Sequence, residues 1–305
     1  MTTKNILVLG GGGFIGSHVI GNLVKNCEAN IYSIGRGKCM DNTLHVSHCI
    51  DNITFASLEK NFSNIQFDEI INCSGGGNVS VSFSYPREDF QNTVVSLVDV
   101  LEFIRVYQKN AKLVQLSSAA VYGECVDLPI SESKECDPIS VYGEYNFLAE
   151  RLVKTYSKHY GLQSVILRVF SVYGPGLKKQ IIWDAMEKLS RASDEVTFFG
   201  TGNELRDFIY IEDLCSIITL AASWASEQTN IINCSSGKPI LIKELVNKIA
   251  LICDRDVSIV FSGESKSGDP KGFHADVSKL SFECKTSLDE GLKTYIDWYQ
   301  NELKN

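Results

Sequence analysis

Glycines 10, 13 and 16 stand where a short apolar run ends and a helix is expected to begin, within the segment 6–18. Glycines at this spacing let the chain turn tightly, bring bare backbone amides up to a pyrophosphate and pack the new helix closely on a sheet. A flexible glycine turn without a ligand is the alternative. We expect a dinucleotide site that uses Gly10, Gly13, Phe14, Ile15 and Gly16.

The end of the second expected strand bears on the choice of dinucleotide. This position normally meets the adenosine ribose, where a carboxylate accepts from the 2′-hydroxyl and an arginine pairs with a 2′-phosphate. The segment 33–36 has no carboxylate and ends in Arg36. We therefore expect NADP(H) to be preferred over NAD(H), unless Arg36 only belongs to a surface turn.

Two further segments complete the expected cofactor pocket. Asp51 follows a short extended stretch, and its carboxylate could accept from the adenine amino group; its alternative role is to form a turn. Ser74 and Gly75 begin a second small-residue turn, which permits close approach of the cofactor backbone.

A serine pair and a tyrosine carry the expected chemistry. Ser117 and Ser118 end a strand in the segment 113–123, and Tyr142 begins a helix in the segment 140–146. Together with the glycine turn and the segments 167–176, 200–209 and 268–276, they resemble the extended short-chain dehydrogenase/reductase superfamily. The similarity is to its NAD(P)-dependent nucleotide-sugar epimerase/dehydratase branch and runs over nearly the whole chain.

The resemblance implies roles for these side chains. In that family a tyrosine is the acid/base on a sugar hydroxyl or carbonyl while nicotinamide exchanges a hydride, and Tyr142 matches it. Ser118 matches the serine that hydrogen-bonds the same oxygen. Ser117, Tyr142 and Asn146 are also expected beside the cofactor. Alternatively, Tyr142 is a packed aromatic residue at a helix start.

Asn146 departs from the family pattern, which has a lysine four residues after the tyrosine. A free phenol with a pKa near 10 is a poor base at neutral pH and needs a nearby positive charge. Asparagine can hydrogen-bond the nicotinamide ribose but cannot stabilise a phenolate. The oxidised nicotinamide's own charge, loss of activity and a cation from elsewhere are the competing explanations, and we favour retained, slow chemistry.

The resemblance also bounds the substrate, a nucleotide-diphosphate sugar. Arg206 matches the pyrophosphate-binding arginine, with a structural ion pair to Asp207 as the alternative. Ser171 replaces a common asparagine, and Asp269 lies in an altered Arg-Pro-Gly-Asp motif, so we expect Ser118, Ser171, Arg206 and Asp269 to contact substrate.

Three functions follow from these residues. Ala119 and Ala120 stand where a 4,6-dehydratase has an Asp-Glu pair, so dehydration is disfavoured. Because Arg36 favours dissociable NADPH, reduction of a 4-keto-6-deoxy sugar is the main interpretation. Epimerisation at C4 is the alternative, and a catalytically impaired nucleotide-sugar or NADP-binding protein is the third; a scaffold without nucleotide fits least.

Strands and helices alternate along the first part of the chain. Strands are predicted at 6–9, 29–34, 69–73, 112–117, 163–169 and 230–234, with helices at 17–26, 90–108 and 145–160. This pattern predicts an α/β fold: a doubly wound parallel (Rossmann) sheet with a smaller C-terminal α/β substrate lobe. We assign residues 1–172 and 207–233 to the cofactor domain and residues 173–206 and 234–305 to the nucleotide-sugar lobe.

Composition sets the remaining limits. The net charge of −8 with dispersed basic residues disfavours a nucleic-acid surface. No apolar run reaches the ~18 residues of a membrane span, and no export signal precedes the first strand, so we expect a cytoplasmic protein without a membrane partner. The ten cysteines show no metal-binding spacing, and no metal is expected. Members of the family that the chain resembles commonly dimerise by packing two helices from each subunit into a bundle, so the resemblance implies a homodimer through the apolar face of residues 90–108. The alternative is that this face packs on the sheet.

Overall fold

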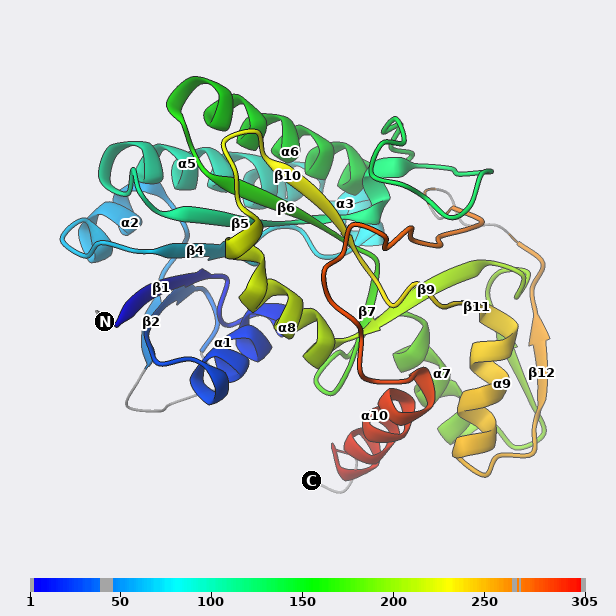
Figure 1. Ribbon diagram of the computed structural model, residues 1–305. Coiled ribbons are helices and arrows are strands. Elements are labelled where there is room, and N and C mark those ends of the chain that lie inside the picture. Colours follow the sequence, from blue (N-terminus) through cyan, green and yellow to red (C-terminus); the bar gives the residue numbers. More distant parts are fainter. Residues whose placement is uncertain (1–2, 39–45, 265–267, 269, 303–305) are drawn as a thin grey trace.

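A seven-stranded parallel sheet forms the centre of the protein (Figure 1), seen in a computed structural model that describes residues 3–38, 46–264, 268 and 270–302. Its strand order is β10-β6-β5-β4-β1-β2-β3. The bounds are β1 Lys4–Leu9, β2 Ala29–Gly35, β3 Val46–Ile50, β4 Glu69–Asn72, β5 Lys112–Ser118, β6 Ser164–Val169 and β10 Asn230–Cys234. This doubly wound sheet confirms the predicted fold class.

Both faces of the sheet are covered because its strands are apolar on both sides. Every residue of β4 and β6 is buried, as expected for parallel strands between helical layers. On one face lie α1 (Phe14–Asn26) and α8 (Ile211–Ala221). On the other lie α2 (Phe55–Phe62), α5 (Ser96–Tyr107) and α6 (Val141–Tyr160).

Three predicted helices have different bounds in the structure. The first begins at Phe14 instead of position 17, because Gly13 is its extended N-cap residue. The helix predicted from position 145 begins at Val141, since the Ser140 hydroxyl accepts from Gly143 N at 3.0 Å and caps it. Tyr142 is thus in its first turn. The helix predicted at 90–108 is α4 (Pro86–Phe90), a π-helical segment η1 (Gln91–Val95) and α5.

A smaller lobe lies below the carboxyl edge of the sheet (Figure 1). Strands β7 (Ser171–Tyr173), β9 (Leu205–Tyr210) and β11 (Pro239–Leu241) form one sheet, and β8 (Glu195–Phe198) pairs with β12 (Ser258–Phe261). Helices α7 (Gln180–Arg191), α9 (Ile242–Ile252) and α10 (Leu288–Glu302) pack with them. The sequence indicated the lobe but not these elements, and its domain limits, 1–172 with 207–233 against 173–206 with 234–305, stay a prediction.

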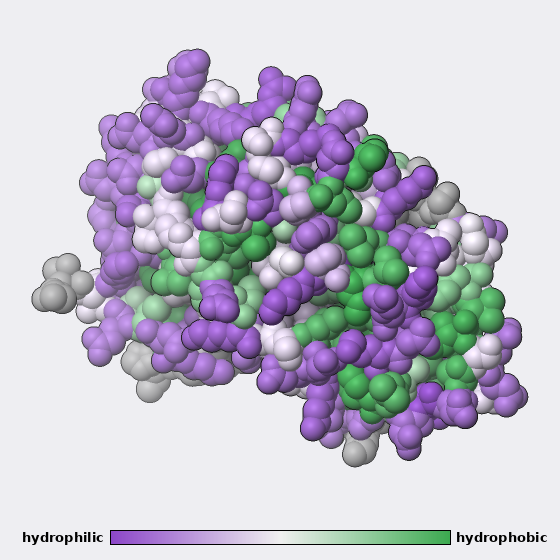
Figure 2. Space-filling model, turned by 45° about the vertical axis from the view of Figure 1, so that its right-hand side comes forward, coloured by the Kyte–Doolittle hydropathy of each residue, from purple (hydrophilic) through white to green (hydrophobic). Residues whose placement is uncertain are grey.

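Short elements complete the chain: α3 (Val79–Ser84) and the 3-10 turns η2 (Ala119–Tyr122) and η3 (Ala222–Trp224). Polar side chains cover much of the face in Figure 2, with apolar patches between them. Within the part of the chain that the structure describes, no helix has the length and apolarity to cross a membrane.

Candidate active site

The glycine turn between β1 and α1 is tightly closed. Gly10 adopts a φ of 79°, which glycine tolerates best, and its N–H donates to Ile34 O at 2.8 Å. A Cβ on Gly16 would come within 2.3 Å of Gly10 O, so α1 packs directly against the turn. The N-terminus of α1 therefore lies at the carboxyl edge of the sheet, and no side chain caps its backbone N–H groups. These N–H groups would stabilise an anion bound there.

A cleft of about 660 Å³ opens beside this turn. Six residues predicted from the sequence to bind cofactor line it: Gly10, Gly13, Arg36, Asp51, Ser74 and Gly75. Arg36 is exposed, and Asp51 uses one carboxylate oxygen to accept from Asn52 N at 2.7 Å. The volume lies within the range of cofactor pockets. The glycine-lined wall leaves room for a dinucleotide, so these residues fit the expected group.

The opposite wall was not foreseen from the sequence. Gln91, Asn92 and Val95 of the π-helical segment, with Ser96 and Asp99 of α5, also line the cleft. Helical segments of the π type are frequent at functional sites. A π-helix has a longer period than the 3.6 residues per turn of an α-helix. The apolar residues of 90–108 recur at α-helical spacing, so the sequence predicted one continuous helix instead of this irregular one.

The loop after β4 is held from two sides. Gly76 N donates to Thr93 Oγ1 at 2.9 Å, and the Lys179 ammonium donates to Gly77 O at 2.7 Å. Asp89 lies next to Gly76, since a Cβ there would be 1.6 Å from Asp89 Oδ1. Asp89 is 5% exposed and its Oδ2 is buried without a hydrogen-bond partner among the described residues. Burial raises the pKa of this carboxyl.

Tyr142, Ser118 and Asn146 come together at the carboxyl end of β5. Burial raises the pKa of the Tyr142 phenol, and the nearby Asp89 carboxylate raises it further. Hydrogen bonding with the Ser118 and Asn146 side chains acts in the opposite direction but does not cancel the rise in pKa. The phenol is therefore in its protonated form at neutral pH.

Asn146 is committed to the helix backbone. It is 8% exposed, and its Nδ2 donates to Tyr142 O at 2.8 Å. Ser82 Oγ accepts from Tyr142 N at 3.1 Å and fixes the first turn of α6 from α3. The structure thus places the tyrosine firmly without supplying a cation at position 146.

A buried ion pair lies directly behind the serines. Ser117 Oγ donates to Glu150 Oε1 at 2.7 Å, so this hydroxyl faces the interior. Glu150 receives both Nε and Nη2 of Arg168, at 2.9 and 2.6 Å. The Arg168 guanidinium also stacks 4.7 Å from the centre of the Tyr122 ring. This pair anchors the end of β5 to β6 and α6.

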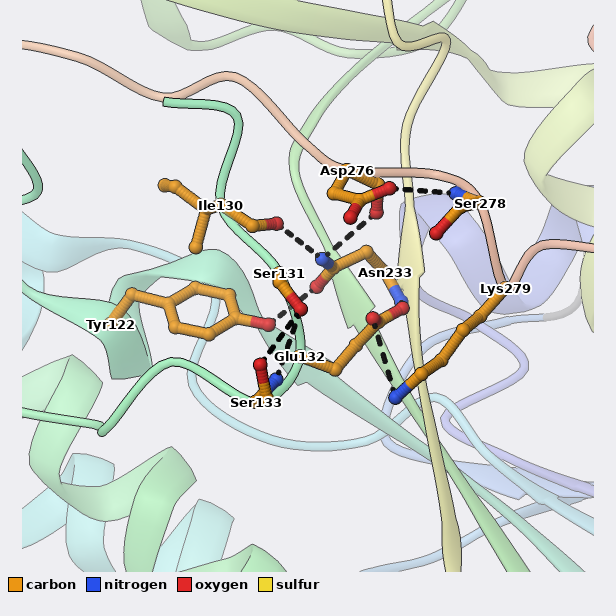
Figure 3. Close-up of polar contacts among 9 residues, drawn as sticks. All are labelled: Tyr122, Ile130, Ser131, Glu132, Ser133, Asn233, Asp276, Ser278 and Lys279. Carbon is orange, nitrogen blue, oxygen red and sulfur yellow. Dashed lines mark hydrogen bonds and ion pairs between the residues drawn. The ribbon is translucent and has the colours of Figure 1, made fainter. Parts of the chain in front are cut away.

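The network continues from Tyr122 into the lobe (Figure 3). The Tyr122 hydroxyl donates to Asn233 Oδ1 at 2.6 Å, and Asn233 N donates to Glu132 Oε1 at 2.9 Å. Asn233 Nδ2 donates to the carbonyls of Ile130 and Asp276. Lys279 Nζ lies 3.6 Å from Glu132 Oε2. Segments 130–133 and 276–279 are therefore fastened to β10 beside the site.

Two of the predicted substrate residues, Ser171 and Arg206, lie on the lobe, whereas Ser118 ends β5 of the large sheet. Ser171 is on β7 and Arg206 on β9, neighbouring strands of the three-stranded sheet. Arg206 Nη1 donates to Leu205 O at 2.8 Å, and the guanidinium lies 5.6 Å from the centre of the Phe273 ring. Asp207 accepts from Ser236, Gly237 N and Ala275 N and so organises the lobe. Asp269 lies outside the described residues.

The sheet, the glycine turn and the serine–tyrosine arrangement define a dinucleotide-dependent enzyme. Residues 6–235 match the family model for the NAD dependent epimerase/dehydratase family. The chain belongs to this family and is an enzyme of it. This confirms the family resemblance deduced from the sequence motifs.

Known relatives match the chain over nearly its full length. A UDP-glucose 4-epimerase from Halalkalibacterium halodurans is 27% identical, covering 97% of this chain and 95% of its own. The solved UDP-glucose 4-epimerase from Thermotoga maritima, with UDP-glucose, is 27% identical with a TM-score of 0.90 and covers 98% and 100% of the two chains.

A third relative was solved with both ligands. It is a mutant UDP-glucuronic acid 4-epimerase from Bacillus cereus in complex with UDP-4-deoxy-4-fluoro-glucuronic acid and NAD. It is 25% identical, with a TM-score of 0.88 and coverage of 98% and 100%. These relatives favour epimerisation over the 4-keto sugar reduction that we preferred from the sequence, and NAD over NADP.

Proposed function

We propose that the protein is an NAD-dependent 4-epimerase of a UDP-sugar. The observation that carries the proposal is the hydrogen-bonded pair of Tyr142 and Ser118 at the end of β5, in a sheet whose β1 ends at the turn that lines the dinucleotide cleft. Support also comes from end-to-end similarity to UDP-sugar 4-epimerases. The reductase interpretation depended on Arg36 and NADPH, and the comparisons do not support it.

The cofactor would be held at the glycine turn between β1 and α1. The amides of the turn around Gly10 and Gly13 and the start of α1 at Phe14, Ile15 and Gly16 would hold its pyrophosphate. Asp51, Ser74 and Gly75 line the cleft beside them. When bound there, NAD would supply a reversible hydride acceptor for C4 of the sugar.

The side chains of the site handle the proton. Only the phenolate form of Tyr142, the minor form at neutral pH, takes the proton of the C4 hydroxyl as the 4-keto sugar forms, while Ser118 hydrogen-bonds the same oxygen. After the keto sugar has turned over, Tyr142 returns the proton and the configuration at C4 is inverted. The cycle consumes no net hydride and no net proton.

Asn146 bears on how fast this cycle runs. In the described part of the chain, no basic side chain lowers the pKa of the Tyr142 phenol. We therefore expect slow turnover at neutral pH that depends on the positive charge of the oxidised nicotinamide. The impaired binding protein is the second candidate, and Asn146 is the observation that favours it.

Substrate binding is assigned to the lobe. Arg206 and Ser171, on neighbouring strands, would contact the diphosphate, and Asp269 of the separate segment 268–276 is proposed as a further substrate contact. Preference for NADP now depends on Arg36 alone, which is exposed at the cleft. Titration with NAD and NADP compares the two affinities; tighter NAD binding removes that prediction.

Assembly and location complete the proposal. Phe90 packs edge to face on Tyr145 at 5.2 Å, and the apolar residues Val95 and Leu148 are exposed on η1 and α6. We propose that this region forms the homodimer interface and that the protein is cytoplasmic.

A substrate panel tests the proposal. The NAD-loaded protein is incubated with UDP-glucose, UDP-N-acetylglucosamine and UDP-glucuronic acid, and the products are separated by chromatography. We expect the C4 epimer of at least one sugar, with no lasting change in reduced nicotinamide, and no product from Tyr142→Phe. Stoichiometric consumption of NADPH with a 4-keto sugar as the substrate would instead support the reductase interpretation.

A further inference from the structure

One lysine side chain joins the lobe to the loop after β4. Lys179 is the residue before α7 of the lobe, and its Nζ donates to Gly77 O, in the loop after β4 of the large sheet, at 2.7 Å. The two residues are 102 positions apart in the sequence. A Cβ on Gly77 would lie 3.1 Å from this nitrogen, so glycine permits the close approach.

This ammonium lacks an anionic partner among the described residues. Burial lowers the pKa of Lys179, and no carboxylate acts against that shift. An ammonium has three donors, of which one is used by Gly77 O. The neighbouring Lys178 is different, because it pairs with Glu302 at 2.5 Å on the surface. A half-buried, unneutralised lysine costs free energy unless a ligand offsets it.

The surroundings of Lys179 reinforce its charge. It precedes a helix with no acidic residue in its first turn and no side-chain cap, so the positive end of the helix dipole adds to the ammonium. Gln180, the next residue, has a φ of 69°, a left-handed conformation that is strained for a non-glycine residue. Lysine at such a helix start is unfavourable in the absence of an anion.

The segment that carries Lys179 passes over the cofactor end of the cleft. A Cβ on Gly176 would lie 3.7 Å from the His18 ring and 3.8 Å from the Phe14 ring, both on the first turns of α1. Gly77 continues from Ser74 and Gly75, which line the cleft. The ammonium is therefore located where the dinucleotide cleft meets the lobe.

We propose that Lys179 is a substrate-positioning residue that binds an anionic group of the UDP-sugar, either its diphosphate or a carboxylate on the sugar. The inference rests on the proposed function. One donor of the ammonium is held by Gly77 O, and its two remaining donors would bind the anion. The contact also draws the lobe and the β4 loop together around the substrate.

Calorimetric titration of the NAD-loaded protein with UDP, UDP-glucose and UDP-glucuronic acid tests this role. Lys179→Met should weaken binding roughly 10- to 100-fold, as expected for loss of one charge-assisted hydrogen bond. Weakening of all three ligands identifies the diphosphate, and weakening of UDP-glucuronic acid alone identifies the carboxylate. Lys179→Arg should retain most of the affinity, and the matched control Lys178→Met should retain all of it.

Other outcomes overturn the proposal. Unchanged affinities in Lys179→Met, an equal loss in Lys178→Met, or weaker binding of NAD alone would each contradict a substrate role for Lys179. If the unmodified protein bound none of the three UDP compounds, the proposed function itself would fail, and the inference with it. Melting temperatures of the variants show that each is folded.

Discussion

Two regions on either side of the strand ends differ in whether their charged side chains are paired. Behind β5 and β6, Glu150 and Arg168 are 0% and 2% exposed at their side chains and are joined by two short hydrogen bonds. Around the loop after β4, Asp89 and Lys179 bear charges that no oppositely charged group meets in the described part of the chain. The pair Glu150 and Arg168 holds the strand ends in place, whereas the region of Asp89 and Lys179 can bind ligands.

This difference separates stability from function. The charges of Glu150 and Arg168 neutralise each other, although Arg168 Nη1 lacks a hydrogen-bond partner among the described residues. A buried pair of opposite charges fixes the geometry of its members, whereas a buried charge without such a partner costs free energy that a ligand can recover. We therefore expect substitutions behind the strands to change the free energy of unfolding most. Substitutions in the cleft should instead change ligand affinity and the pH dependence of turnover.

The largest effect is expected from breaking the interior pair. Glu150→Ala leaves the Arg168 guanidinium charged and buried, so it should lower the free energy of unfolding by about 3–5 kcal/mol. Chemical denaturation measures this loss. The control is Asp184→Ala, which breaks the surface pair with Lys188 and should cost about 0.3–0.5 kcal/mol. If the two variants lost the same free energy of unfolding, the buried pair would be no more important for stability than the surface pair.

Next in size is the effect of filling the glycine turn. Gly16→Ala places a Cβ against Gly10 O, and the turn must shift by an amount that costs about 1–3 kcal/mol. We expect NAD affinity, measured by fluorescence titration, to fall roughly 10- to 100-fold. Gly272→Ala serves as the control because its Cβ would meet only the flexible Leu128 side chain, at 3.1 Å. Normal NAD affinity in Gly16→Ala would show that the turn does not hold the dinucleotide.

Restoring a cation beside the phenol should shift the pH dependence of turnover. Burial raises the pKa of Tyr142, so the rate should rise with pH into the alkaline range. In Asn146→Lys an ammonium favours the phenolate, and the rising limb should move to lower pH by about 1–3 units. The pH profile of kcat measures the shift, with Asn146→Leu as the uncharged control. An unmoved limb in Asn146→Lys would mean that the phenolate is not the base.

The smallest effect concerns Asp89. Burial raises its pKa in the folded state, so the charged form destabilises the fold above the unfolded pKa of about 3.9, and the penalty disappears below it. Asp89→Asn should therefore stabilise the protein at pH 7 by roughly 1 kcal/mol and leave it unchanged near pH 3. Thermal melting at both pH values tests this, with exposed Asp127→Asn as the control. Destabilisation at pH 7 would indicate a partner for Asp89.

The sequence foretold the parallel sheet well because each buried strand is a nearly continuous apolar run. Strand β10 has the predicted bounds 230–234, and the strand predicted at 163–169 differs from β6 by one residue. The lobe was foreseen only as separated segments. In α7 and α10, charged residues stand between the apolar ones, and the apolar faces of these helices were overlooked.

The site was predictable where neighbours in sequence are also neighbours in space. The glycine turn and the pair Tyr142 and Asn146 fall within single segments. The contacts from Tyr122 to Asn233 and from Lys179 to Gly77 join residues 111 and 102 positions apart, and no local pattern encodes them. Burial of Asp89 likewise depends on the tertiary position of α4.

The most direct test of the account follows the hydrogen at C4. UDP-glucose carrying deuterium at C4 is incubated with the NAD-loaded protein, and the product is examined by proton NMR. We predict UDP-galactose that retains the deuterium at C4, because the hydride leaves and returns within one site while Tyr142 moves only the hydroxyl proton. Inversion with loss of the deuterium to solvent would contradict this cycle.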